Sequence, residues 1–200
     1  DNIQNYRIMA NWASTSYAIE GSKEELNKLY ELIEGFMKHK MEPVTETASD
    51  GWEGNIVKSL GATEEQMKQN YLRGFIEDYD LGEGVLHIYA EEAWGATDFR
   101  HVLAELMPDL TIYFCVEEPG CEVYATNDAD SKYFPDRYYV DAFVNDDYCS
   151  EYFDDEDKAM KFAAELTGRE QISKEELAKW NNEQEDDDVF IYVHEFEVVA

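Results

Sequence analysis

Hydrophobic and polar positions near the start of the chain alternate first and then change to a helical period. The stretch Trp12–Glu20 alternates loosely and is rich in Ser, Thr and Tyr, which predicts a β-strand. Ser22 and Glu25 follow with the spacing of a capping box, in which each side chain accepts a backbone N–H at the helix start. Apolar residues then recur at steps of three and four, which predicts an amphipathic helix: Leu26, Leu29, Tyr30, Ile33, Phe36 and Met37.

The segment from about residue 40 to 80 is less regular, because proline and glycine interrupt it. We expect a helical insertion here, with a short helix at residues 56–60. A second capping box, Thr63 and Gln66, predicts a helix that runs to about residue 72. The sequence YDLGEG then turns the chain into a strand at residues 85–90.

The second half begins with a predicted helix near residue 98, followed by an apolar strand at residues 110–116. Pro119 and Gly120 suit the central positions of a type II turn, because proline presets its φ and glycine accepts a positive one. This turn is expected to join the apolar strand to residues 121–125 as a hairpin.

The last third of the chain repeats these signals. A strand is predicted at residues 137–144, and an acidic run just after residue 153 predicts a helix start that Gly168 ends. Ser173 has the spacing of a third capping box, and residues 189–199 predict a long final strand.

The order of these elements indicates an α+β fold. We expect a ferredoxin-like core, with an antiparallel or mixed sheet and helices on one face. The whole chain, residues 1–200, is predicted to form a single domain. Its core spans about residues 9–144, includes the helical insertion at about 40–80, and is followed by an extension at 145–200 within a β-α-α-β tail.

Two stretches carry a resemblance to a known family. MANWASTSYAIEG, residues 9–21, resembles the opening strand of the YubB-like family of plasmid and phage proteins, which typically begin with a Met-Ala-Asn-Trp phrase. AEEAWGATDFRHVLAELMPDLTIYFCVEEPGCEVYA, residues 90–125, is similar to the second segment of that family. The matching positions there are Ala93, Trp94, Pro108, Asp109, Glu118 and Gly120.

The resemblance implies a ferredoxin-like fold and an origin in a mobile element. It supplies no established catalytic residues, and Trp12, Trp94, Glu118 and Gly120 are therefore expected to be fold positions. The chain departs from the family at Gly95-Ala96-Thr97, where the family tends to have prolines. The resemblance does not extend to residues 145–200.

The net charge of the chain restricts its partners. With 46 acidic and 16 basic residues the formal net charge is -30, which repels nucleic acid and anionic membranes. The 10 Phe and 14 Tyr residues indicate a folded protein rather than a disordered one. We therefore expect no direct nucleic-acid or membrane partner, while basic proteins and metal cations remain open.

The cellular compartment is predicted from what the chain lacks. It contains no apolar run of about 18 residues and no signal-peptide pattern at its start. Three cysteines are an odd number without metal spacing, so we expect free thiols in a reducing cytoplasm: Cys115, Cys121 and Cys149.

The chain shows no complete nucleotide-binding or zinc motif, so no cofactor is predicted. Three carboxylates flank the predicted turn, and its register places Glu117 opposite Glu122, with Glu118 beside them. Like charges facing one another are unfavourable, and a divalent cation could relieve them. Exposure to water is the other interpretation of this cluster.

Two acidic runs are candidate interaction surfaces. The first lies where a helix start is predicted, and there the helix dipole already favours negative charge: Asp154, Asp155, Glu156 and Asp157. The second follows a helix, where negative charge is unfavourable: Glu183, Glu185, Asp186, Asp187 and Asp188. Either these carboxylates keep a loop hydrated, or they mimic the phosphates of DNA for a basic groove.

The sequence favours a non-enzymatic accessory protein of a mobile element, binding a basic or DNA-binding protein through an acidic, tyrosine-rich surface. Two alternatives stay open. One is an enzyme that holds a divalent metal with carboxylates, in which calcium, magnesium or manganese would raise the melting temperature. The other is a structural module whose partner is encoded nearby.

Overall fold

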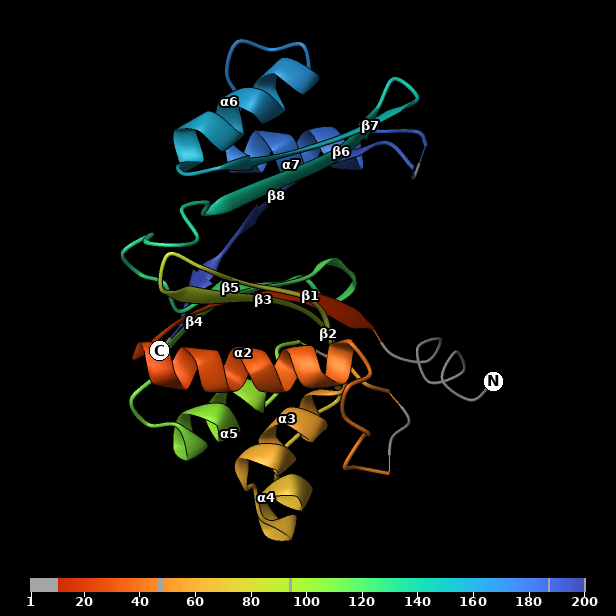
Figure 1. Ribbon diagram of the computed structural model, residues 1–200. Helices are drawn as coiled ribbons and strands as arrows, with labels where there is room; N and C mark the ends of the chain where they lie inside the picture. Colours follow the sequence, from red (N-terminus) through yellow and green to blue (C-terminus); the bar gives the residue numbers. More distant parts are fainter. Residues whose placement is uncertain (1–10, 47–48, 94, 187, 200) are drawn as a thin grey trace. The chain divides into compact units, whose positions relative to one another are not determined.

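The computed structural model describes residues 11–46, 49–93, 95–186 and 188–199 (Figure 1). The chain divides into two compact units, the first ending at Asn127 and the second beginning at Asp128. Strands and helices are both abundant, and the predicted α+β class is confirmed.

The first unit is built on an antiparallel sheet whose strands run in the order β2-β3-β1-β4-β5. The strands are β1 (Trp12–Glu20), β2 (Gly74–Gly82), β3 (Val85–Ala93), β4 (Thr111–Glu118) and β5 (Val123–Thr126). Four helices lie on one face of this sheet (Figure 1): α2 (Lys23–Met37), α3 (Glu53–Leu60), α4 (Glu64–Gln69) and α5 (Phe99–Leu106). A 3-10 turn, η1 (Pro119–Cys121), joins β4 to β5.

Helix α2 forms where its sequence predicts, because both the cap and the apolar stripe are present. Ser22 caps it, and Glu25 completes the capping box by accepting the Ser22 N–H at 3.1 Å. The apolar stripe is buried against the sheet, and Leu29, Ile33 and Phe36 are fully inaccessible to water. Helix α2 packs against β2 and β3, and these side chains form the core of the first unit together with buried apolar residues of the sheet.

The second unit has its own three-stranded antiparallel sheet, in the order β7-β6-β8. Its strands are β6 (Tyr138–Val144), β7 (Asp147–Phe153) and β8 (Phe190–Glu195), and a short strand β9 (Glu197–Val198) follows. Helices α6 (Glu156–Leu166) and α7 (Lys174–Asn182) pack on one face of the sheet. The buried residues between them are small or aliphatic: Val140, Ala142, Ala159, Ala163, Ala164, Ile172, Leu177 and Ile191.

Two strand segments differ from the sequence prediction, and each difference has a local cause. Residues 79–82 are predicted to lie in a turn but belong to β2, and only Glu83 and Gly84 turn the chain, both with positive φ. The helical insertion is correspondingly shorter than predicted, because β2 begins at Gly74. Strand β7 follows a tight turn at Asn145 and Asp146, which both have positive φ, as the two central residues of a type I′ hairpin require.

Three further expectations are corrected. The predicted type II turn at residues 118–121 is a 3-10 turn, and the left-handed residue is Glu122 rather than Gly120. The β4-β5 register therefore places Glu117 opposite Tyr124, not opposite Glu122. The long final strand is interrupted at Phe196, which divides it into β8 and β9.

The boundary between the units also differs from the one expected between core and extension. Strand β6 is predicted to belong to the core, but it is the central strand of the second sheet and pairs with both β7 and β8. The compact unit therefore begins at Asp128 rather than at residue 145. The single-domain arrangement of residues 1–200 stays a prediction.

The segment that leads into β6 is organised by one buried carboxylate. Asp128 accepts the backbone N–H groups of Lys132 at 3.0 Å, Tyr133 at 2.7 Å and Phe134 at 2.9 Å. Burial by itself would raise the pKa of the Asp128 carboxyl, but these three hydrogen bonds and Arg137 outweigh it and the pKa is lowered. A lowered pKa means that the ionised form stabilises the fold.

We expect Asp128→Asn to lower the free energy of unfolding by about 1–3 kcal/mol at neutral pH, because an amide cannot accept all three N–H groups. The pKa is lowered in the folded state, so this contribution is present above the ordinary Asp pKa and lost as the pH falls below it. Denaturant unfolding of both proteins at several pH values measures the difference. Asp130→Asn, at an exposed position two residues away, is the control and should change little.

Candidate functional site

The second sheet has one face covered by helices and a second face rich in aromatic side chains. Alternate residues of the three strands point to this second face, and the strand registers align them in three rows. We call it the tyrosine face, and it consists of nine residues: Tyr139, Asp141 and Phe143 on β6, Tyr148, Ser150 and Tyr152 on β7, and Phe190, Tyr192 and His194 on β8.

The rings of the tyrosine face lie close to one another. The ring centroids of Tyr139 and Tyr152 are 4.6 Å apart, and those of Phe190 and Tyr192 are 5.0 Å apart with planes 20° from parallel. Tyr139 also stacks on His194 at 6.0 Å and 22°. The last two of these ring pairs are nearly parallel, and the face presents layered aromatic surface to its surroundings.

Three of these tyrosines remain open to water. Tyr148, Tyr152 and Tyr192 are 55%, 43% and 47% exposed, which is high for residues of this size in a sheet. The Tyr139 hydroxyl lies 3.2 Å from that of Tyr148. Burial and this hydrogen bond raise the pKa of Tyr139 to about 12. Its ring therefore stays an uncharged phenol at neutral pH.

A carboxylate lies at the centre of the nine residues. Asp141 is opposite Ser150 on one neighbouring strand and Tyr192 on the other. His194 Nε2 lies 2.8 Å from Asp141 Oδ1, and both side chains are largely buried. None of the nine residues is Lys or Arg. The tyrosine face therefore combines aromatic surface with a carboxylate at its centre.

The acidic run at the start of α6 has local structural roles. Asp155 is the N-cap and accepts the Lys158 N–H at 2.9 Å, while Asp154 forms an ion pair with the Lys158 ammonium at 2.5 Å. Glu156 forms an ion pair with Lys174 at 2.7 Å, and Asp157 lies exposed in the first turn of the helix.

The second acidic run lies at the C-terminal end of α7. Glu183 is the C-cap of this helix, and Glu185, Asp186 and Asp188 are exposed, while Asp187 lies outside the described residues. The ion pair of Glu156 with Lys174 places the first run beside the start of α7. Nine helical residues, about 14 Å, separate the two ends. The described members of the two runs therefore do not form one cluster.

The family-like positions are mainly parts of the fold. Trp12 packs against Phe75 with ring centroids 5.6 Å apart, and the Arg73 guanidinium lies over its ring. Glu118 is 2% exposed, and Gly120 faces open space. Trp94 lies outside the described residues.

The cation site suggested by the sequence at the β4-β5 turn is not assembled by the register, because Glu118 points to the core side while Glu122 is exposed. Throughout the part of the chain that the structure describes, no group of three or more His, Cys, Asp or Glu side chains could hold a metal ion.

A second notable arrangement lies in the core of the first unit, where Glu53 and Glu92 are fully buried. The hydroxyl oxygen of Thr97 lies 2.7 Å from Glu53 Oε2 and 2.7 Å from Glu92 Oε1. It also accepts the N–H of Phe99 at 3.2 Å. A hydroxyl has one hydrogen and two lone pairs, so it can donate only one of the two bonds to the carboxyl groups.

One of the two carboxyl groups must therefore carry a proton and donate the second hydrogen bond. Glu92 Oε1 also accepts the Tyr17 hydroxyl at 2.7 Å. Glu53 is the better candidate for the carboxyl that carries this proton, because its pKa is raised. Burial, together with the charge of Glu92, raises the pKa of Glu53 well above its ordinary value.

The pair cannot reach a substrate, because both side chains are inaccessible to water. Sequence reasoning did not identify either residue, although one signal was present. Along β3 the inward positions are Leu86, Ile88 and Ala90, and Glu92 continues this apolar series as a charged residue. The pairing with Glu53 depends on contacts between distant segments, which no local pattern indicates.

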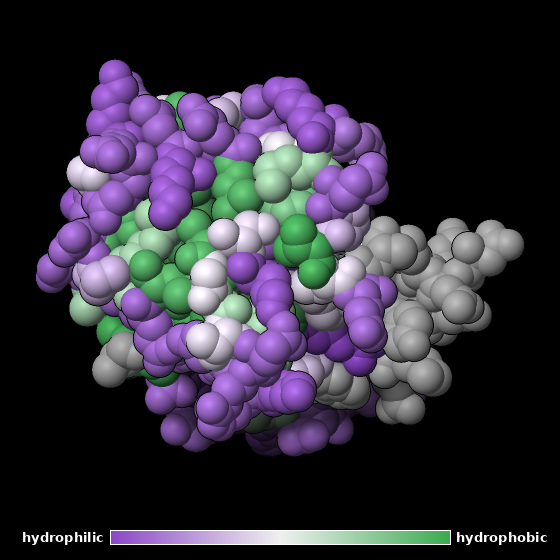
Figure 2. Space-filling view, turned by 60° about the horizontal axis from the view of Figure 1, so that its bottom comes forward, coloured by the Kyte–Doolittle hydropathy of each residue, from purple (hydrophilic) through white to green (hydrophobic). Residues whose placement is uncertain are grey.

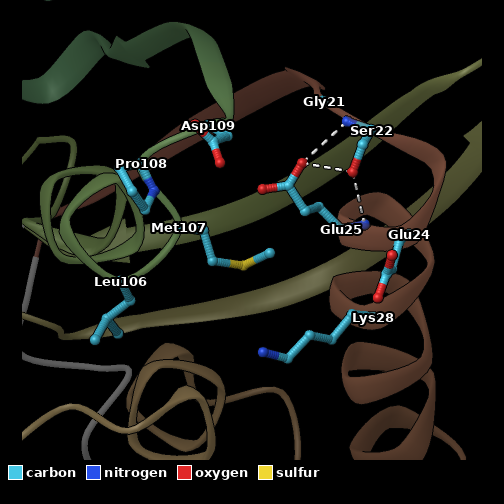
Figure 3. A pocket seen from close by; sticks show the side chains of 9 residues that line it. All are labelled: Gly21, Ser22, Glu24, Glu25, Lys28, Leu106, Met107, Pro108 and Asp109. Carbon is cyan, nitrogen blue, oxygen red and sulfur yellow. Dashed lines mark hydrogen bonds between the residues drawn. The ribbon is translucent and has the colours of Figure 1, made fainter.

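A hollow in the first unit lies between the start of α2 and the end of α5 (Figure 3). It has a volume of about 670 Å³ and is lined by Gly21, Ser22, Glu24, Glu25, Lys28, Leu106, Met107, Pro108 and Asp109. The Glu25 carboxylate accepts the Ser22 hydroxyl at 2.6 Å, and Lys28 extends from the same helix, on the side that faces Leu106 and Met107 (Figure 3). The polar groups do not converge on one point, and the hollow offers no pair for acid-base chemistry.

Figure 2 looks onto the helical side of the first unit, where hydrophobic side chains gather inside a hydrophilic rim.

Comparison of the chain with protein-family models, with curated proteins and with solved structures found no match. Among the described residues, no helix is both long enough and apolar enough to cross a membrane.

The buried carboxyl of Glu53 leaves no room for a side chain at Gly74. A Cβ at this position would lie 2.4 Å from the Glu53 carboxyl carbon, and Glu53 is held by Thr97 and cannot move freely. We expect Gly74→Ala to lower the free energy of unfolding by about 1–3 kcal/mol. Gly120→Ala is the matched control, because a Cβ there would meet no atom within 4 Å, and denaturant unfolding compares the two.

The proton on Glu53 predicts a pH dependence of stability. The pKa is raised in the folded state, so the contribution is present below the ordinary Glu pKa of 4.5 and is lost as the pH rises toward the folded value. Glu53→Gln keeps a donor to Thr97 but has no proton to lose. We expect its stability relative to the unchanged protein to rise by up to about 1.4 kcal/mol per pH unit above pH 4.5, until the pH reaches the folded-state pKa of Glu53.

Unfolding by denaturant between pH 4 and 8 measures this difference. Glu31→Gln, at an exposed position of α2, is the control and should show no such rise. Parallel pH profiles for the Glu53 variant and the unchanged protein would show that Glu53 is ionised in the folded state.

Proposed function

We propose that the chain is a non-enzymatic interaction protein that binds a basic protein through the tyrosine face. The observation that carries the proposal is the placement of exposed Tyr148, Tyr152 and Tyr192 around the largely buried Asp141 carboxylate. Aromatic faces attract ammonium and guanidinium groups through their negative π-surfaces, and a carboxylate adds a full charge of the same sign.

The charge of the second unit supports a basic partner. Residues 128–200 contain 22 acidic and 7 basic residues, a net charge of -15. A field of this size speeds the approach of a positively charged protein and repels nucleic acid and anionic surfaces. The acidic runs at the two ends of α7 contribute to this long-range field and need not form one contact surface.

The partner best suited to this charge is a DNA-binding protein with a basic groove. In this proposal the surface carboxylates attract the basic groove from a distance, as the phosphates of DNA do. The tyrosine face then provides the close contact. The sequence resemblance to the YubB-like family supports an origin in a mobile element. Such elements benefit from occupying the DNA-binding surfaces of host proteins.

The first unit serves as a scaffold in this proposal, and we infer a ferredoxin-like core for it. The element order β1-α2-β2-β3-α5-β4 and the strand order β2-β3-β1-β4 support that arrangement. Helices α3 and α4 are then an insertion, and β5 an addition at one edge. The thiols of Cys121 and Cys149 support a cytoplasmic location.

The proposal predicts that basic host proteins retained by the immobilised full chain depend on the exposed rings. We expect the triple variant Tyr148→Ser, Tyr152→Ser, Tyr192→Ser to weaken retention about tenfold or more, since each exposed cation-aromatic contact contributes about 0.5–1 kcal/mol. The net charge is unchanged, so the loss cannot come from a weaker long-range attraction. Binding measured from about 50 to about 500 mM salt should weaken steadily, because the attraction is screened.

The matched control replaces two exposed tyrosines of the first unit, Tyr71→Ser and Tyr89→Ser. It should retain the partner as the unchanged chain does. A retained DNA-binding protein should also be released from its DNA by the unchanged chain. Equal retention by the triple variant, or no basic protein retained at low salt, would contradict the proposal.

A further inference from the structure

The tyrosine face has a chemistry that distinguishes between cationic side chains, and the following inference rests on the proposed function. Its nearly parallel rings and its central carboxylate suit a flat cation that can also donate hydrogen bonds, which describes arginine but not lysine or trimethyl-lysine. We infer that the tyrosine face binds an arginine side chain of the partner, with the guanidinium stacked on an aromatic ring and facing Asp141.

The ring geometry favours a planar cation. Phe190 and Tyr192 have planes 20° apart, and Tyr139 and His194 have planes 22° apart. The Tyr192 ring also contacts His194, with ring centroids 6.1 Å apart and planes tilted by 50°, so a flat group would stack on the part of the Tyr192 ring that stays exposed. Guanidinium is flat and stacks on aromatic faces, whereas an ammonium group is a compact charge without a plane.

The central carboxylate is held in place before a ligand arrives. His194 Nε2 lies 2.8 Å from Asp141 Oδ1, which fixes the side chain, and the register sets Asp141 between Ser150 and Tyr192. A prearranged acceptor loses little conformational freedom on binding. The guanidinium fork offers five N–H donors, so one donor can reach the carboxylate while the plane stays stacked.

Hydration separates arginine from lysine in the same place. Guanidinium is weakly hydrated, and its transfer onto an aromatic surface costs less than that of the strongly hydrated ammonium group. The Asp141 side chain is only 20% exposed, so a cation that reaches it must lose water. The site therefore discriminates against lysine, even though both side chains are attracted equally from a distance.

The same geometry disfavours trimethyl-lysine. Quaternary ammonium groups are bound by aromatic cages that surround them, with rings on several sides. Here the neighbouring rings of Phe190 and Tyr192 are nearly parallel and stand side by side in the sheet. Such rings offer one stacking surface rather than an enclosure.

The test uses the full chain and three fluorescent peptides of equal length, in which glycine alternates with arginine, with lysine or with trimethyl-lysine. Fluorescence anisotropy at about 150 mM salt, where distant charges are largely screened, measures their dissociation constants. We expect the arginine peptide to bind about tenfold more tightly than either of the others, because only guanidinium can stack and donate together. Long-range attraction is the same for all three peptides, so the difference reports on the contact itself.

Two variants with the same change of charge locate the contact. Asp141→Asn should remove most of the preference for arginine over lysine, whereas Asp147→Asn, at the exposed start of β7, should retain it. Circular dichroism shows whether Asp141→Asn is folded. Tyr192→Ser, at an exposed site, should also reduce the preference and provides the test if that variant is unfolded.

The outcomes separate this inference from the proposed function. Equal affinity for the arginine and lysine peptides, or binding by neither, overturns the inference. The same is true if Asp141→Asn and Asp147→Asn have equal effects. The retention of a basic protein by the tyrosines is measured separately, and it can succeed while the preference for arginine fails.

Discussion

The two-residue period of β6 is the constraint on which the second unit depends. This strand is hydrogen-bonded on both sides, so its side chains can point only to one face of the sheet or the other. Val140 and Ala142 meet the helices, and small alanines on α6 allow the close approach. The residues between and beside them are Tyr139, Asp141 and Phe143, which therefore share the opposite face. A shift of one residue in the register would exchange the two sets and expose the core.

The chain uses its carboxylates in two opposite ways. Most of them lie outside, where water and a few lysines accommodate them, and together they produce the net charge of -30. Glu53 and Glu92 lie inside, where one proton is held between them with the help of Thr97. The interior arrangement joins α3 to β3 and to the segment before α5. Hydrogen bonds connect these three segments, while the outer charges act over distance.

Much of the fold could be predicted from local patterns, because helix caps and the spacing of apolar residues depend only on residues that are close together in the sequence. Ser22, Thr63 and Ser173 all cap helices as their spacing predicts. Strand β7 could not be predicted in this way, because its DYCSEYF sequence mixes polar and apolar residues on both faces and follows a turn of Asn145 and Asp146 rather than glycine. The sites were harder to predict than the helices. The tyrosine face combines residues from three strands, and its rows exist only once the strand registers are known. The acidic runs attract attention because they are nearly continuous in sequence, whereas in the structure several of their members are caps and ion-pair partners at two ends of a helix.

The outer strand β7 has a consequence for the solubility of the protein. An open strand edge beside exposed rings is the kind of surface on which chains stack into aggregates. Here Asp147 and Glu151 lie exposed on that strand, within a unit that carries a large excess of negative charge. Two copies approaching edge to edge repel one another, whereas a cationic protein is drawn in. The negative charge on and around β7 therefore works against edge-to-edge pairing of two copies of the chain.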